Sequence, residues 1–154
     1  MIIFIILISS LDQLTKSIAS RNLHLNQSFP VIKNIFHLTL VHNRGAAFGI
    51  FQNQAFLFIL TACLAIAVIL TNLKKIRLEK RVSLRKVSLG LIMAGAVGNL
   101  IDRLRFGYVI DFLDFRVWPV FNIADSAITV GAVLLCWAFL REPGTKEQRE
   151  SPKT

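Results

Sequence analysis

The chain has 154 residues, of which 54% are hydrophobic, and its mean hydropathy is +0.58. A soluble domain carries far more charge on its surface, so this composition excludes a soluble globular protein and predicts one membrane-embedded domain over residues 1–154. The net charge of +9 comes from basic residues that flank apolar stretches, without the interleaved aromatics that nucleic-acid sites use, so we expect no nucleic-acid partner.

The cysteines and histidines do not suggest metal chemistry. Cys63 and Cys136 lie in different apolar stretches, and in antiparallel helices their depths would differ by roughly 12 Å, which is beyond disulfide reach. The three histidines form no HExxH arrangement. We therefore predict no disulfide, no metal site and no cofactor.

The length accommodates about four spans of about 20 residues, and the first is predicted at residues 2–19. This stretch lacks the basic start and uninterrupted apolar core of a cleaved signal peptide, so we expect it to be retained. Asp12 and Lys16 are four residues apart and share a helix face, which favours a structural ion pair. The alternative is a catalytic dyad of Lys16 with a serine. The candidate hydroxyls for such a dyad are those of Ser17, Ser20 and Ser126.

Residues 20–54 are mixed in character, and apolar residues alternate with polar ones over 35–43. Only helices and closed barrels cross a bilayer, so this alternation predicts a small extracytoplasmic β element, a strand pair, between the first and second spans. The following segment, 43–51, is rich in glycine and alanine, which allow close backbone approach. It is either a turn at the membrane interface or a flap that faces a substrate.

Residues 55–73 form an uncharged second span, and the loop that follows carries seven lysines and arginines over 74–86. The positive-inside rule places this loop in the cytoplasm. The tail, 141–154, is also basic, so we expect it on the same side. Four spans with a cytoplasmic carboxyl terminus require a cytoplasmic amino terminus. The fold class is therefore an α-helical integral membrane protein with both termini in the cytoplasm.

The third and fourth spans are predicted at 87–104 and 120–140. Asn99 and Arg103 share a helix face near the outer end of the third span, and a short loop leads from there to the fourth. Asn122 lies three residues before Asp125, so both are expected on one face about one turn from the outer boundary.

Most of the nine acids are unsuited to catalysis by their position. The glutamates lie in the basic loop or the tail, and Asp12 and Asp102 each have a cation nearby in sequence. Asp111, Asp114 and Asp125 remain. Asp111 and Asp125 flank a chain reversal and can face each other, whereas Asp114 points the opposite way on an extended path.

Two carboxylates in one poorly hydrated cleft are expected to share a proton. The ionised member would activate a water molecule for attack on a peptide carbonyl, and the protonated member would donate to that carbonyl. Asn122 and Arg103 could hold the substrate backbone. The alternatives from other classes are a small proton-coupled transporter that uses the same acids and a lipid-binding scaffold without catalysis.

Five short blocks, in this order along the chain, resemble the motifs of bacterial lipoprotein signal peptidase, also called signal peptidase II. They are DQLTK at 12–16, NRGAAFG at 43–49, GNLIDR at 98–103, VIDF at 109–112 and FNIADS at 121–126. The resemblance covers residues 11–140. It implies an aspartic endopeptidase of the bacterial cytoplasmic (inner) membrane, with its active site near the extracytoplasmic face. It also implies diacylglyceryl-modified prolipoproteins as substrates, cut just before the lipidated cysteine.

The resemblance implies that Asp111 and Asp125 are the catalytic pair. The supporting or substrate-contacting positions of the family fall on Asp12, Lys16, Asn43, Gly45, Asn99, Asp102, Arg103 and Asn122. We expect a monomer that contacts membrane lipids and needs no cofactor.

Overall fold

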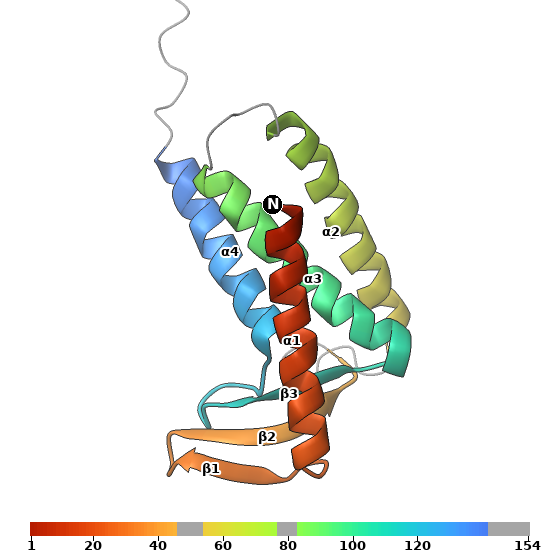
Figure 1. Ribbon diagram of the computed structural model, residues 1–154, viewed down its shortest axis with the longest axis vertical. Helices are drawn as coiled ribbons and strands as arrows, with labels where there is room; N and C mark the ends of the chain where they lie inside the picture. The colour runs from red at the N-terminus through yellow and green to blue at the C-terminus, as the bar shows by residue number, and fades with distance from the viewer. Residues whose placement is uncertain (46–53, 77–82, 142–154) are drawn as a thin grey trace, which may run out of the picture.

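The computed structural model describes residues 1–45, 54–76 and 83–141. Four helices and three strands occur in the described residues (Figure 1). The helices are α1 (Ile2–Asn22), α2 (Ala55–Ile76), α3 (Leu84–Phe106) and α4 (Ile123–Leu140), and the strands are β1 (Ser28–Ile32), β2 (Phe36–Asn43) and β3 (Val109–Asp114). The amino terminus, the end of α2, the start of α3 and the end of α4 lie at one end of the bundle, and the sheet lies at the other.

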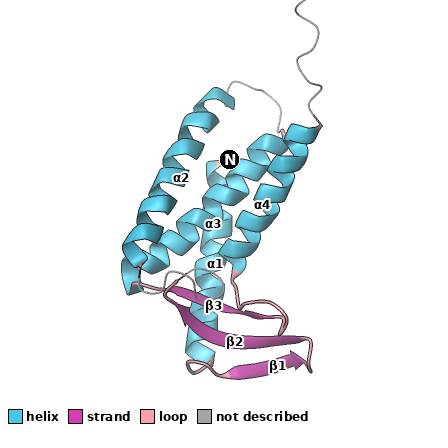
Figure 2. Ribbon diagram, turned by 180° about the vertical axis from the view of Figure 1, so that it is seen from behind, coloured by secondary structure: helices cyan, strands magenta, loops and turns pink. Residues whose placement is uncertain are grey.

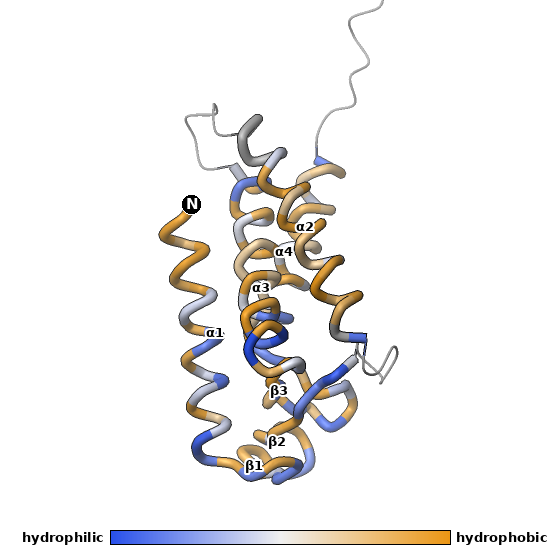
Figure 3. Tube along the Cα trace, turned by 90° about the vertical axis from the view of Figure 1, so that its right-hand side faces the viewer, coloured by the Kyte–Doolittle hydropathy of each residue, from blue (hydrophilic) through white to orange (hydrophobic). Residues whose placement is uncertain are grey.

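Three of the described helices, α1, α3 and α4, are long and apolar enough to cross a membrane, and α2 has an apolar core over Phe56–Thr71. Their outer faces expose large apolar side chains, among them Ile2, Leu64 and Val133. Exposing such apolar faces to water would be unfavourable, whereas contact with lipid chains carries no such cost. Figure 3 shows the amino-terminal half of α1 as hydrophobic, with its hydrophilic residues in the half nearer the sheet.

Helix α3 is the centre of the bundle, because it packs against each of the other three helices. Small residues bring its backbone close to its neighbours. A Cβ added at Gly95 would collide with the backbone oxygen of Ala124 in α4. At Gly131 of α4, an added Cβ would lie 2.8 Å from the backbone oxygen of Ser88. Such close contact of small residues is how helices associate where no hydrophobic effect draws them together.

The sheet has the order β1-β2-β3 and is antiparallel throughout (Figure 2). The predicted strand pair between the first two spans is confirmed as β1 and β2. The prediction of a short loop around Asp111 is wrong, because residues 109–114 form β3 and pair with β2. The strand is almost fully buried, so it lacks the alternation that marks a half-exposed strand. Its partner strand lies more than 60 residues earlier, as in the pairing of Asn43 with Val109.

The four helices lie where the sequence predicts spans, and no end differs from its prediction by more than three residues. The predicted spans 2–19, 55–73, 87–104 and 120–140 correspond to α1, α2, α3 and α4 in that order. The start of the fourth is predicted three residues too early. Phe121 instead forms an isolated bridge with Leu113, and Asn122 is the N-cap of α4. The predicted flap beyond residue 45, the basic loop at 77–82 and the tail at 142–154 lie outside the described residues.

Candidate active site

Asp111 lies in β3, beyond the ends of the helices, and only 1% of it is exposed. Two amide groups hold its carboxylate. Asn43 of β2 donates through Nδ2 to one oxygen over 2.9 Å, and Asn122 donates through Nδ2 to the other over 2.6 Å. Asn43 pairs with Val109, two residues before Asp111 in β3, so Asn43 and Asp111 are diagonal neighbours on one face of the sheet. The carboxylate is therefore fixed by the sheet on one side and by the start of α4 on the other.

Asp125 lies in the first turn of α4 and is partly exposed. It forms a capping box with Asn122: the Asn122 side chain accepts from the Asp125 N–H over 2.9 Å, and the Asn122 N–H donates to Asp125 over 3.3 Å. Asn99 of α3 donates through Nδ2 to the other carboxylate oxygen over 2.7 Å. A negative charge here also interacts favourably with the helix dipole.

Asn122 bonds both aspartates, so the structure brings Asp111 and Asp125 to one site. Burial, and after it the charge of Asp125, raises the pKa of Asp111 from 3.8 to about 7, against the bonds from Asn43 and Asn122 that lower it. A carboxyl group with this pKa holds a proton for much of the time at neutral pH. The site can thus offer an ionised and a protonated carboxyl group together.

Asn122 is completely buried, and its side chain donates to Asn99, the Ile110 carbonyl and Asp111. These bonds suit it to position the two carboxylates, and its contact with the substrate backbone stays a prediction.

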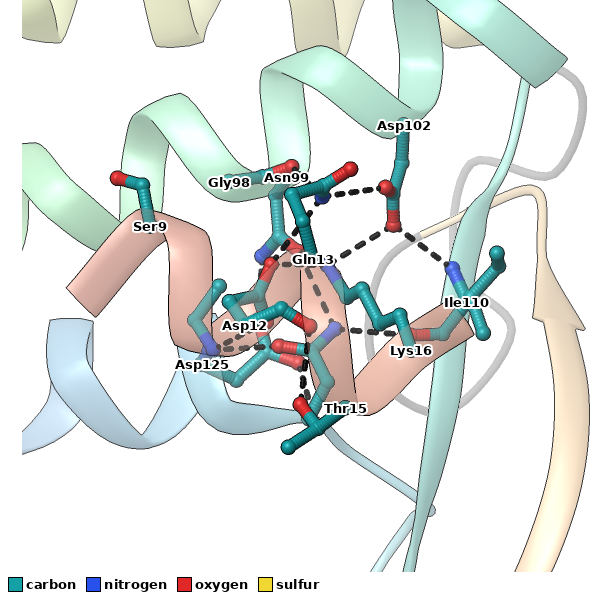
Figure 4. Close-up of polar contacts among 12 residues, drawn as sticks. Ser9, Asp12, Gln13, Thr15, Lys16, Gly98, Asn99, Asp102, Ile110 and Asp125 are labelled. Carbon is teal, nitrogen blue, oxygen red and sulfur yellow. Dashed lines mark hydrogen bonds and ion pairs between the residues drawn. The ribbon is translucent and has the colours of Figure 1, made fainter. Parts of the chain in front are cut away.

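A buried ion network lies beneath this pair (Figure 4). The predicted pair of Asp12 and Lys16 is present at 2.8 Å, and Lys16 binds Asp102 at 2.8 Å as well. The other oxygen of Asp12 accepts from the Ala124 N–H at the start of α4 over 2.9 Å. Asp12 therefore satisfies one of the free N–H groups of α4 from a different helix.

Asp102 does not pair with Arg103 as its sequence neighbourhood suggests, because consecutive residues of a helix point in different directions. Its carboxylate instead binds Lys16, and it accepts from the Ile110 N–H of β3 over 3.1 Å. Since Ile110 precedes Asp111, this bond ties β3 to α3 next to Asp111. Arg103 lies 4.9 Å above the ring of Phe58 in α2, where the charges of Asp125 and Asp111 act on it.

Gly45 contributes through its backbone. Its N–H donates to Oδ1 of Asn43 over 3.0 Å. This bond orients the Asn43 amide so that the Nδ2 group faces Asp111. Gly45 therefore acts on the site indirectly, by orienting the side-chain amide of Asn43 toward Asp111.

Asp114 belongs to a separate group, as its position on the strand predicts. It accepts from Thr39 over 2.7 Å and pairs with Arg116 at 3.0 Å. Burial raises the pKa of Asp114, but these bonds outweigh the effect and hold the pKa below its usual range.

Gln13 belongs to the buried ion network, although the sequence did not predict a role for it. It donates to Asp102 over 2.8 Å and to the Gly98 carbonyl over 3.1 Å. Its only signal in the sequence is its place in the polar run beside Asp12. The alternative of a serine and lysine dyad is wrong. The contacts of Lys16 are Asp12, Asp102 and Asn99, and Ser126 donates to the Asn122 carbonyl.

Comparisons with known proteins agree on one family. The family model described as signal peptidase (SPase) II matches residues 3–141. A lipoprotein signal peptidase of Moorella thermoacetica is 47% identical over 96% of this chain and 95% of its own length. One of Halothermothrix orenii is 49% identical over 86% of this chain and 90% of its own length. A solved structure of a bacterial membrane enzyme superposes with a TM-score of 0.83 at 30% identity, over 98% of this chain and 93% of its own.

Proposed function

Since the chain belongs to the signal peptidase II family, we propose that Asp111 and Asp125 are the catalytic pair of its aspartic peptidase. The observation that carries the proposal is the fully buried Asn122, whose side chain donates to the Asp111 carboxylate and whose backbone N–H donates to the Asp125 carboxylate, so that both are held at one site. The pair lies where the helices end and the sheet begins. A transporter would be expected to keep its acids near the midplane of the bilayer, whereas Asp111 lies on a strand beyond the helices.

The protein removes signal peptides from prolipoproteins. In the proposed mechanism, the ionised carboxyl group takes a proton from a bound water molecule, which attacks the scissile carbonyl. The protonated carboxyl group donates to the carbonyl oxygen. As the peptide bond breaks, the carboxyl group that took the proton from water passes it to the departing amine, and the other carboxylate recovers its proton as the carbonyl re-forms. Arg103, held over Phe58 beside the pair, is suited to bind a backbone carbonyl of the substrate. Asp12, Lys16, Asn43, Gly45, Asn99, Asp102 and Asn122 would support the site.

We place the cut just before a diacylglyceryl-modified cysteine. Because the carboxylates lie at the junction of helices and sheet, the acyl chains of such a residue would remain beside the apolar helix faces while its peptide bond reaches the pair. We propose four spans, with α2 crossing the membrane in addition to α1, α3 and α4, and a monomer surrounded by lipid in the cytoplasmic (inner) membrane.

The orientation follows from charge. The end of α2, the start of α3 and the end of α4 lie at one end, next to sequence rich in lysine and arginine. That end would be cytoplasmic, with both termini, and the sheet and catalytic pair would face outward.

The test is cleavage of a purified diacylglyceryl prolipoprotein by Asp111→Asn and Asp125→Asn variants reconstituted in lipid. Each variant should insert normally and lose cleavage by at least about a thousandfold, since one carboxyl group cannot act as both base and acid. Asp114→Asn is the matched control, because Asp114 lies in β3 like Asp111 but its partners are Thr39 and Arg116. This variant should still cleave. Substantial cleavage by either of the first two variants would reject the pair.

A further inference from the structure

Resting on the proposed catalytic pair, we propose that Lys16 is a positioning residue for the reaction: it orients the amide of Asn99 so that Asn99 stabilises ionised Asp125, which makes Asp125 the base and leaves the shared proton on Asp111. Neither Lys16 nor Asn99 needs to touch the substrate, since both are buried, with 1% and 6% of their surface exposed.

The contacts of Lys16 use all the hydrogens of its ammonium group. Nζ lies 2.8 Å from Asp12, 2.8 Å from Asp102 and 2.9 Å from Oδ1 of Asn99. An ammonium group has three donors and no acceptor. The three acceptors come from α1 and α3, so the position of Nζ is fixed from both helices (Figure 4).

This contact decides which way the Asn99 amide points. An ammonium group can only donate, so the Asn99 atom that faces Lys16 is the oxygen, and it also accepts from Asn122 over 3.1 Å. The NH₂ group must then face Asp125, to which it donates over 2.7 Å. A flipped amide would place NH₂ against the ammonium group and oxygen against the carboxylate, and both contacts would be repulsive. Lys16 thereby secures a donor for Asp125.

The amide route matters more than the charge of Lys16 acting through space. Asp12 and Asp102 both contact the ammonium group, so the three ions together carry no excess positive charge. The side-chain amide of Asn99, which is hydrogen-bonded to both Lys16 and Asp125, still transmits an effect. A hydrogen bond accepted from a cation polarises the amide and strengthens the hydrogen bond that the amide donates.

The surroundings of the two carboxylates agree with this assignment. Asp125 is partly exposed at the amino end of α4, and the charged groups that act around it are Asp12, Lys16, Arg103 and Asp111. Asp111 is almost fully buried in β3. The charges of Lys16 and Arg103 act on it too, but in the described part of the chain its donors, Asn43 and Asn122, accept no hydrogen bond from a cation. Ionisation is therefore easier at Asp125, and water can reach it directly.

The experiment is the pH dependence of kcat/KM on a diacylglyceryl lipopeptide for wild type, Asn99→Leu and Lys16→Met. The acidic limb of the profile reports ionisation of the base in the free enzyme. It should move to higher pH by about half to one unit in each variant, as expected for the loss of one oriented donor. Ser9→Ala is the control, because it removes a buried hydrogen bond of 2.9 Å between α1 and α3 without touching the pair, and its limb should not move.

The double variant tests the order of action. If Lys16 acts through Asn99, adding Lys16→Met to Asn99→Leu should move the limb by less than about a third of the shift that Lys16→Met causes alone. Additive shifts, or an unshifted limb in Asn99→Leu, would overturn the inference. Should Lys16→Met fail to insert, Asn99→Leu still tests the inference: it keeps both ion pairs of Lys16, and an unshifted limb in this variant would overturn the inference. Loss of cleavage in Asp125→Asn together with an unshifted limb in Asn99→Leu would reject this inference while leaving the catalytic pair intact.

Discussion

Gly98 of α3 offers a direct test of how closely the ion network is packed. A Cβ added there would lie 2.6 Å from Oδ2 of Asp12, 3.2 Å from its Cγ and 3.3 Å from the Cβ of Ala124. Asp12 cannot move away cheaply, because its two oxygens are bonded to Lys16 at 2.8 Å and to the Ala124 N–H at 2.9 Å. Gly98→Ala must therefore displace Asp12 or separate α1 from α3.

The magnitude follows from three contributions. Overpacking costs about 1–3 kcal/mol. Loosening one charge-assisted hydrogen bond costs about 1.5 kcal/mol. The higher helix propensity of alanine returns about 1 kcal/mol. The net destabilisation should be about 1.5–3.5 kcal/mol. Cleavage should also fall, because Asp12 and Lys16 support the start of α4 and Asn99.

Gly90→Ala, in the same helix, is the matched control. Its Cβ would lie 3.2 Å from Cδ1 of Phe4, a side chain that can turn slightly aside. This variant gains the same helix propensity without the clash, so its stability should stay within about 1 kcal/mol of wild type. The measurement is unfolding of both variants in detergent micelles, together with their cleavage rates. Equal stability and activity in the two variants would show that Asp12 is not held as tightly as its contacts indicate.

Three further predictions concern the proposed catalytic pair and its neighbours. Burial raises the pKa of Asp111 from 3.8 to about 7, so the folded protein keeps a proton that the unfolded chain releases, and its stability falls as the pH rises between those values. Asp111→Asn removes this penalty and should be more stable than wild type by about 4 kcal/mol at pH 8, with no advantage below about pH 4, as measured by unfolding across pH; an advantage independent of pH would contradict the burial argument. Asn122→Ala removes the N-cap of α4 and a donor to Asp111, so it should cost about 1–2 kcal/mol of stability and lower cleavage at least about a hundredfold. Ser126→Ala should cleave within about threefold of wild type, because its hydroxyl donates to the Asn122 carbonyl one turn earlier and makes no contact with Lys16; loss of cleavage in this variant would revive a serine mechanism.

The sequence alone was sufficient for the features that depend on local pattern. Long apolar stretches predict the membrane helices, because each helix satisfies its own backbone hydrogen bonds and needs only apolar side chains outside. The alternation of apolar and polar residues over 35–43 predicts β2, because successive side chains of a strand point to opposite faces of the sheet. The spacing of Asp12 and Lys16 predicts their ion pair, since residues four apart meet on any helix.

Contacts between distant segments required the tertiary structure. Residues 109–114 become a strand only because β2 pairs with them, and Asp102 binds Lys16 of another helix rather than its neighbour Arg103. The role of Asn122 also depends on the fold, because its amide meets Asn99, Ile110 and Asp111 only after α3, β3 and α4 have packed. Partners that lie far apart along the chain leave no periodic signal, and the cost of burying these polar groups is met only when every partner is in place.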